Sequence, residues 1–250
     1  MKEIVGQEIA VVSDIHGNSF ALQEVLKDIK ERGITTIINL GDSLYGPLDP
    51  KGTYELIVNN SIQSISGNQD RLIVENWDAK SDYITLEYVK SQLDENMLHW
   101  LQSLASDQSV NDEIYCCHAS PHSDSVYLLE QLVADKVSTK NKEELDALLS
   151  HIKQGIVCCG HSHVSKIVRT AKKVIVNPGS VGLPAYDDEL PIYHKMENHK
   201  PNSNYVVMKK SHDSLKLNRI SVEYDFEEAA SLAEQNHRDD WAKWIRTGTV

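Results

Sequence analysis

The first part of the chain alternates short apolar runs with amphipathic stretches. The apolar runs are rich in Ile and Val, which is typical of buried strands, and they lie at residues 8–13, 35–40 and 61–66. Between the first two runs, apolar residues recur at helical spacing from Ser19, a candidate N-cap, until Gly33 ends the pattern. A second helix is expected after Asp49, because a proline follows in its first turn. Strands that alternate with helices predict a parallel sheet with right-handed crossovers.

The remainder of the chain is helical first and then rich in strands. We expect a helical insertion at about residues 69–105, packed over one side of the sheet, and another helix near residues 145–152. Further strands are predicted at residues 113–117, 155–159, 166–169 and 173–176, with an antiparallel pair at 204–209 and 215–223. C-terminal helices are predicted at about residues 226–245, and the longest loop at residues 191–204. Because no repeat or linker interrupts the pattern, we expect a single α/β domain over residues 1–250, two-layered or sandwich-like.

Composition and charge narrow the class of protein. At 40% hydrophobic residues the chain can build a core, and its net charge of −12 without a basic tract argues against nucleic acid as a partner. No apolar run approaches the ~20 residues that cross a bilayer, so no membrane partner is expected. Residues 1–6 carry no signal-peptide pattern. These features predict a cytoplasmic protein and leave its oligomeric state open.

The four cysteines form two adjacent pairs, at residues 116–117 and 158–159. Both pairs lie in predicted strands, where neighbouring residues face opposite sides. Zinc ligands would prefer a two-residue spacer between the cysteines. We therefore expect buried, reduced thiols rather than disulfides or a zinc site.

Five polar clusters stand where predicted buried strands end. Because ligands of open α/β sheets bind beyond the carboxyl ends of the strands, clusters that are distant in sequence can converge there. Together they offer carboxylates, imidazoles and an amide oxygen, a mixed set that suits Mn, Fe, Zn or Ni. The clusters are Asp14-Ile15-His16, Gly41-Asp42, Gly67-Asn68-Gln69-Asp70, His118 and Gly160-His161-Ser162-His163.

Each cluster alone has an ordinary structural interpretation. The cluster at residues 14–16 could cap the following helix, and the clusters at 41–42 and 67–70 contain common turn sequences. The paired histidines at 161 and 163 could belong to a surface loop. Agreement of all five clusters at strand ends favours one binuclear metal site over five unrelated turns.

The clusters together resemble the calcineurin-like metallophosphoesterase superfamily, whose pattern is D-x-H, G-D, G-N-H-[D/E], a later H and G-H-x-H. The resemblance continues into residues 177–182, a stretch similar to one in small bacterial members, and covers roughly two-thirds of the chain. It implies an α/β fold in which a β-sandwich is flanked by helices.

The resemblance also implies a role for each matching residue. The first metal ion would be held by Asp14, His16 and His163. The second would be held by Asn68, His118 and His161, with Asp42 bridging both ions. Near the bound phosphate would lie Asn18 and Asn68. The implied catalytic residues are Asp42, Asn68, Gln69 and Asn18.

Two metal ions suit phosphate-ester hydrolysis for a physical reason. Anionic oxygens repel a nucleophile, and two cations ~3.5–4 Å apart neutralise that charge and bind the transition state. A water molecule that bridges them is acidified, so a hydroxide can attack phosphorus in line with the leaving oxygen. Because histidines bind metal only when neutral, activity is expected to fall at low pH.

Gln69 departs from the family pattern, which usually has histidine at this position. That histidine is generally assigned as a general acid or as a hydrogen-bond donor to the transition state. Glutamine can donate a hydrogen bond but cannot deliver a proton, and a lost general acid costs roughly 10²–10⁴-fold in rate. We therefore expect substrates with good leaving groups to be hydrolysed best. The neighbouring Asp70 is expected to orient His16 or another ligand.

Three further residues are candidate substrate contacts. Arg71 directly follows the third cluster and could meet a phosphate, although a solvated ion pair explains it equally well. His122 and His194 lie in predicted loops and are candidate replacements for the missing histidine. For the remaining histidines and for the tryptophans, helix packing or surface exposure is the simpler interpretation.

The leading hypothesis is a metal-dependent phosphoesterase that acts on a small phosphorylated substrate, either a nucleotide-type phosphodiester or a dinucleoside polyphosphate. A phosphomonoesterase, including a protein phosphatase, is the nearest alternative. A second alternative is a metal-binding scaffold that has lost catalysis, although the full set of ligands argues against it. A nuclease of the same superfamily is disfavoured by the acidic charge.

Overall fold

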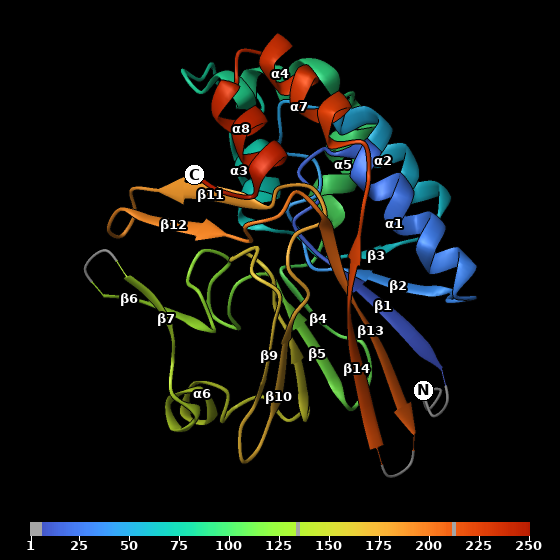
Figure 1. The fold of residues 1–250 in the computed structure, drawn as a ribbon, viewed down its shortest axis with the longest axis vertical. Coiled ribbons are helices and arrows are strands. Elements are labelled where there is room, and N and C mark those ends of the chain that lie inside the picture. Colours follow the sequence, from blue (N-terminus) through green and yellow to red (C-terminus); the bar gives the residue numbers. More distant parts are fainter. Residues whose placement is uncertain (1–6, 134–135, 212–213) are drawn as a thin grey trace.

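Two five-stranded sheets face each other in the computed structural model, which describes residues 7–133, 136–211 and 214–250 (Figure 1). In order across the first sheet, the strands are β14 (Ser214–Val222), β13 (Ser203–Ser211), β1 (Glu8–Val12), β2 (Thr36–Asn39) and β3 (Gln63–Ser64). Those of the second are β4 (Asp107–Ser109), β5 (Ile114–Cys117), β8 (Ile156–Cys158), β10 (Val174–Asn177) and β9 (Lys166–Arg169). Strands β1, β2 and β3 run parallel, as do β5, β8 and β10, and the other pairs are antiparallel.

Alternate residues of β1 face opposite sides of the first sheet, as the two-residue period of a strand requires. Ile9 and Val11 point into the core between the sheets, to which the second sheet also contributes apolar side chains. Ala10 and Val12 point to the outer face, where they pack with α1 (Ser19–Glu31). Both faces of β1 are therefore buried, which explains why its sequence is a continuous apolar run.

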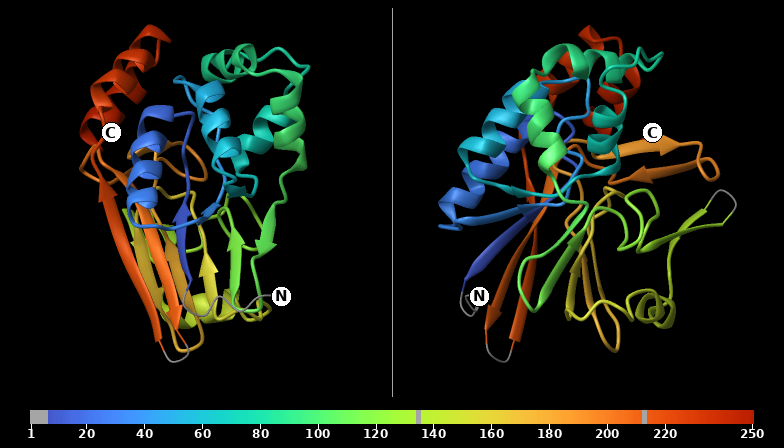
Figure 2. Two further views of the ribbon diagram at one scale, coloured as in Figure 1. Left: turned by 90° about the vertical axis from the view of Figure 1, so that its right-hand side faces the viewer. Right: turned by 180° about the vertical axis from the view of Figure 1, so that it is seen from behind.

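Helices flank the sandwich on both sides. The outer face of the first sheet is covered by helices that include α1, α2 (Pro50–Asn59) and α7 (Phe226–Gln235), whereas α6 (Lys142–Leu148) lies against the second sheet (Figure 1). At one end of the sandwich gather α3 (Asn68–Glu75), α4 (Ile84–Gln92) and α8 (Asp239–Thr247), as both views of Figure 2 show. Helix α5 (Glu95–Ser103) packs against α3. This architecture confirms the predicted fold class, a β-sandwich flanked by helices.

The structure corrects the sequence prediction in three places. The third strand is only two residues long, because only Gln63 and Ser64 pair with β2. The cap of α1 is Asn18, whose side chain accepts from Ala21 N at 3.0 Å, so Ser19 is the first helical residue. The segment 191–204 is not one loop, because it contains β12 (His194–Glu197) and the start of β13.

Two hairpins were not predicted. One pairs β11 (Ala185–Asp188) with β12, and the other pairs β6 (Glu130–Val133) with β7 (Lys136–Thr139). In β12, His194 and Met196 are buried while Lys195 is exposed, so the strand has a two-residue period. The period covers too few residues to be distinguished from a loop in the sequence alone.

All four cysteines are free and buried, as predicted. Cys116 and Cys158 point between the sheets, while Cys117 and Cys159 point to the outer face of the second sheet. Among the described residues, no helix has the length and apolar character that crossing a membrane requires. The N-terminal segment that lacks a signal-peptide pattern, residues 1–6, lies outside the described residues.

Replacing Ile38 with alanine tests the core between the sheets. Ile38 is 2% exposed and packs among residues from both sheets, so its truncation leaves a cavity. We expect the free energy of unfolding to fall by about 2–5 kcal/mol in urea denaturation. The matched control is Ile84→Ala in α4, where the side chain is 57% exposed and the change should stay within about 0.5 kcal/mol. Equal losses in the two variants would contradict this placement of the core.

Candidate metal centre

The five polar clusters converge at the end of the sandwich toward which the parallel strands run. Asp14 and His16 follow β1, and Asp42 follows β2. The remaining residues of the clusters follow β3, β5 and β8, and they are Asn68, His118, His161 and His163. Residues that are widely separated in sequence meet here because the carboxyl ends of parallel strands share one edge of a sheet.

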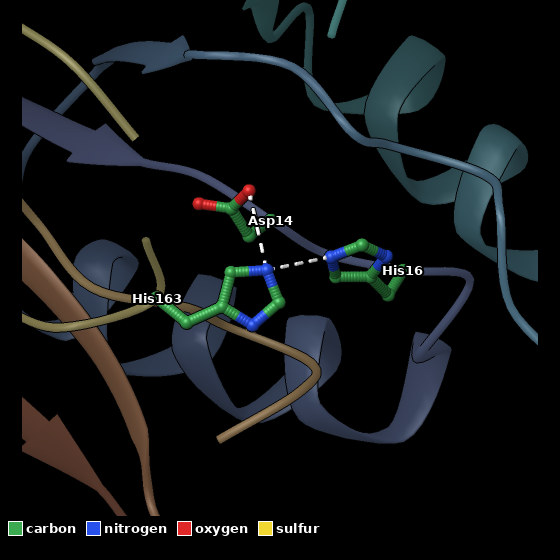
Figure 3. A group of neighbouring side chains, drawn as sticks. All are labelled: Asp14, His16 and His163. Carbon is green, nitrogen blue, oxygen red and sulfur yellow. Dashed lines mark hydrogen bonds and ion pairs between the residues drawn. The ribbon is translucent and has the colours of Figure 1, made fainter. Parts of the chain in front are cut away.

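Two groups of these side chains have the geometry of metal sites. Ligand atoms lie within 4.8 Å of one another in each group, and the groups are Asp14, His16 and His163, and Asp42, His118 and His161. In the first group, His163 Nε2 lies 3.0 Å from His16 Nε2 and 3.5 Å from Asp14 Oδ1 (Figure 3). In the second, His118 Nε2 lies 3.5 Å from Asp42 Oδ2 and 3.0 Å from Asn68 Oδ1. The two groups are adjacent, because His118 Nε2 is also 4.0 Å from Asp14 Oδ1.

Backbone carbonyls fix the orientation of three of the histidines. The Nδ1 atoms of His16, His118 and His163 donate to the carbonyl oxygens of Tyr45, Leu40 and Leu183, at 3.0, 2.8 and 2.6 Å. A carbonyl only accepts, so Nδ1 carries a proton and a neutral ring presents the Nε2 lone pair to the centre. In their neutral forms, His16 and His163 then direct two lone pairs at each other. A cation between them would turn this repulsion into coordination.

A buried carboxylate oxygen leads to the same conclusion. Asp14 Oδ1 is buried and has no hydrogen-bond partner in the described part of the chain, while Oδ2 accepts from His161 N at 3.1 Å. Burying an ionised carboxylate without compensation is costly, and a bound cation removes that cost. Imidazoles, carboxylates and an amide oxygen suit mid-row divalent ions. The residues present therefore fit two divalent metal ions.

The backbone at the ligand positions adopts a conformation that residues other than glycine rarely take. The φ angles lie between 53° and 67° at Asp14, His16, Asp42, His161 and His163. Such left-handed residues cost about 1–3 kcal/mol each and cluster at functional sites. Close approach also explains Gly67, where a Cβ atom would lie 2.1 Å from Asp42 Oδ1. The sandwich thus holds the ligands in a strained arrangement that a simple turn would not need.

Burial and neighbouring charge shift the pKa values of these groups in different directions. Burial raises the pKa of Asp14 to about 7, and burial together with the charge of His118 lowers the pKa of His161 to about 3. Burial also disfavours charge on His118, but the carboxylate of Asp42 outweighs it and raises the pKa of His118 to about 10. Burial acts to raise the pKa of the Asp42 carboxyl, but the charge of His118 outweighs burial and lowers that pKa below its usual value. In the metal-free protein, Asp42 and His118 therefore form a buried ion pair.

A network of tyrosines supports the histidines from behind. The ring of Tyr127 stacks on that of His161 with the centroids 4.6 Å apart, and its hydroxyl lies 2.7 Å from the Tyr186 hydroxyl. Tyr186 donates to the carbonyl oxygen of His161 at 3.0 Å, and its ring lies 4.5 Å from that of His163. Neither tyrosine belongs to a motif, so the sequence gives no signal for this role.

Residues next to the ligands hold the loops in place. Asp70 does not contact His16, because its carboxylate accepts from Ser43 N at 2.9 Å and from Gly67 N at 3.0 Å. It thereby orients the loop that carries Asp42. Gln69 N donates to Asp42 Oδ1 at 2.8 Å, and the Gln69 side chain lines the cavity above the metal groups.

The residues predicted to contact substrate are placed in different surroundings. Asn18 is fully buried, and its Nδ2 donates to Gly182 O at 2.9 Å. Arg71 forms ion pairs with Asp124 at 2.6 Å and with Glu75 at 2.8 Å. His122 stacks on His151, with the centroids 4.3 Å apart, and His194 is 2% exposed with Nε2 at 2.8 Å from the Tyr127 hydroxyl. None of the four lines the metal cavity, and a contact of any of them with substrate stays a prediction.

The metal groups open into a cavity of about 250 Å³. Its floor contains His16, Asp42 and His163, and its walls include Trp241 and Trp244 of α8. These tryptophans dock the terminal helix, as the sequence suggested, but Trp241 also meets a ligand, since its ring lies 5.7 Å from that of His16. The C-terminal helices therefore form part of the site.

Fold and site together define a class, an α/β sandwich with two adjacent groups of candidate metal ligands at the carboxyl ends of its strands. A family model for the calcineurin-like phosphoesterase superfamily domain matches residues 8–198. An uncharacterized protein of Methanocaldococcus jannaschii is 27% identical over 260 residues, which cover 95% of this chain and 96% of that protein.

Two crystal structures have the same fold. A metallophosphoesterase from Sphaerobacter thermophilus has a TM-score of 0.74 at 20% identity, covering 97% of this chain and 99% of that one. A hypothetical protein from Pyrococcus horikoshii OT3 has a TM-score of 0.73 at 21% identity, covering 96% of this chain and 98% of that one. The chain belongs to the calcineurin-like phosphoesterase superfamily and is a metal-dependent phosphoric ester hydrolase. The predicted family is thereby confirmed, while the assignment of each ligand to a particular ion stays a prediction.

Replacing Asp42 with asparagine should remove metal and activity together. Asp42 is 2% exposed and belongs to the second group, with its Oδ2 at 3.5 Å from His118 Nε2, so its loss removes negative charge that a cation there needs. We expect one or both metal ions to be lost in elemental analysis, and the rate to fall at least about 100-fold. The control is Asp78→Asn, an exposed carboxylate that should change neither quantity. Full metal content in Asp42→Asn would contradict the bridging role.

Metal binding should become tighter as pH rises. In the metal-free protein His118 holds a proton because its pKa is raised to about 10, and Asp14, with a pKa raised to about 7, is partly protonated near neutrality. A metal ion binds these groups only after the protons leave. Between about pH 6 and 8, the affinity for manganese should rise by up to about tenfold per pH unit for each proton released. Calorimetry in buffers of different ionisation enthalpy measures the release, and an affinity independent of pH would argue against it.

Proposed function

We propose that the protein hydrolyses a small phosphorylated molecule, either a nucleotide-type phosphodiester or a dinucleoside polyphosphate. The observation that carries this choice is Gln69, which stands where the superfamily usually has histidine. The complete ligand set disfavours a scaffold without catalysis, and the net charge of −12 disfavours a nuclease.

The surroundings of Gln69 support a role at the reacting phosphate. Its side chain lines the cavity, and its Oε1 atom is buried without a hydrogen-bond partner in the described chain. The Nε2 group of the same amide carries two N–H donors, which would be the groups available to a phosphate bound in the cavity. An amide does not transfer a proton, so the leaving group would depart as an anion. This favours anhydrides and aryl esters, whose leaving anions are stable. Of the two proposed classes it favours the dinucleoside polyphosphate, because a nucleotide-type phosphodiester would have to release an alkoxide.

Each group in the centre would contribute one physical effect. Bound metal ions would neutralise phosphate charge and lower the pKa of a bound water molecule. His16, His118 and His163 would keep their lone pairs directed inward because backbone carbonyls hold the opposite ring nitrogens. Asp42, whose Oδ1 accepts from Gln69 N, would link the position of the amide to the spacing of the metal ions.

The size of the cavity supports a small reacting group. Its volume of about 250 Å³ lies below the ~300–1,000 Å³ that is typical for sites enclosing a drug-sized ligand. A phosphoryl group with its immediate neighbour would occupy the cavity, while the rest of a larger substrate would extend outside. A folded protein substrate would need its phosphorylated side chain to reach between α8 and the ligand loops. Phosphomonoesterase activity, including protein phosphatase activity, is the alternative that the assay must exclude.

Replacing Gln69 with histidine tests the proposal. The wild-type protein, supplemented with manganese, should prefer bis-p-nitrophenyl phosphate over an alkyl phosphomonoester. Gln69→His should raise the rate on the alkyl ester by roughly 10²-fold, since it restores a general acid, and should change the rate on the aryl diester much less.

The matched control is Gln102→His on the exposed side of α5, which should leave both rates unchanged. A wild-type protein with a strong preference for phosphomonoesters would reject the diesterase proposal. Failure of Gln69→His to alter the ratio of the two rates, with metal content intact, would show that the residue does not govern the leaving group.

A further inference from the structure

We propose that Arg238 binds a second anionic group of the substrate, next to the phosphate that is hydrolysed. The inference rests on one part of the proposed function, namely that the cavity above the metal ligands receives a phosphate. It narrows the substrate class to phosphate esters or anhydrides that carry another negative charge close by, such as a second phosphate.

The charges around the cavity single out Arg238. Among the described residues that line the cavity, it is the one Lys or Arg. The wall also carries the carboxylates of Asp187 and Asp188 on β11, and the chain as a whole is strongly acidic. Since the metal ions would be engaged with the reacting phosphate, a second anionic group needs another cation. Arg238 supplies a positive charge and hydrogen-bond donors at one place.

Two aromatic contacts place the guanidinium near the metal ligands. Arg238 Cζ lies 5.3 Å from the centre of the Trp241 ring, and the Trp241 ring lies 5.7 Å from that of His16. His16 belongs to the first metal group, so a single indole separates the guanidinium from that group. The indole is 3% exposed, and this fixed surface limits where the guanidinium can move.

The guanidinium is held by its neighbours but keeps free donors. Nε and Nη2 donate to the carboxylate of Asp240 at 2.8 and 2.6 Å, and Nη1 donates to Thr85 of α4. A guanidinium has five N–H groups, so about two remain for a ligand. Because α4 and α8 already fix the side chain, binding costs little additional conformational entropy.

The position of Arg238 in the sequence bears on specificity. Arg238 and Trp241 lie beyond residues 8–198, the part that the family model matches. The shared motifs build the metal centre, whereas the C-terminal helices add a wall to the cavity. In this proposal, the preference for substrates with a second anionic group comes from the C-terminal helices, which lie outside those motifs.

Two phosphonates that differ in a single carboxylate test the proposal. Phosphonopropionate carries a second anionic group that propylphosphonate lacks, and neither has an ester bond to hydrolyse. In calorimetric titrations, the manganese-loaded protein should bind phosphonopropionate roughly 10- to 100-fold more tightly, the order expected for a charge-assisted hydrogen bond. Arg238→Gln should lose this preference while its affinity for propylphosphonate stays nearly unchanged.

The control is Arg246→Gln at the other end of α8, where Arg246 pairs with Glu227 and Glu234 outside the cavity. This variant should keep the full preference. If Arg238→Gln does not fold, Arg238→Lys takes its place and should lower the preference severalfold, because lysine lacks the planar fork. No preference in the wild-type protein, or a preference that survives substitution of Arg238, overturns the proposal. Because the measurement is of binding, a lack of esterase activity would count against the proposed function alone.

Discussion

Buried lone pairs face one another at the carboxyl ends of the strands, and positive charge must lie among them. The Nε2 atoms of His16 and His163 are 3.0 Å apart, and Asp14 Oδ1 is buried beside them without a partner in the described chain. A proton can compensate only part of this charge, as it does in the pair of His118 with Asp42. Divalent cations compensate all of it, and the chemistry of the protein follows from that requirement.

The rest of the fold supplies the rigidity that such an arrangement needs. Strands buried on both faces end at the site, and backbone carbonyls at Leu40, Tyr45 and Leu183 fix the rings of three histidines. Left-handed backbone at five ligand positions is unfavourable by itself. The left-handed backbone persists because packing of the sandwich core and its flanking helices holds the loops in this conformation. The strain therefore indicates a site that packing has fixed before any ion binds.

Residues from distant parts of the chain surround one cavity. The motifs from Asp14 to His163 carry the candidate metal ligands and lie in the part of the chain that the family model matches. Gln69 and the C-terminal helix α8 lie around the same cavity. In the proposed function the Gln69 amide acts on the leaving group, and in the further proposal Arg238 binds a second anionic group beside the phosphate.

The sequence by itself determined the sandwich class, the order of its main elements and the places where the candidate ligands follow the strands. Apolar runs mark strands that are buried on both faces, and the ligand motifs stand directly after them, so the pattern of β1 and Asp14 is readable without coordinates. The sequence could not show the hairpin of β11 and β12, because a strand as short as His194–Glu197 has too weak a period. Nor could it show that Asp70 holds the Asp42 loop, or that Tyr186, Trp241 and Arg238 line the cavity beside the candidate metal ligands. Only the tertiary structure decided these contacts, because they join segments distant in sequence through packing that leaves no local pattern.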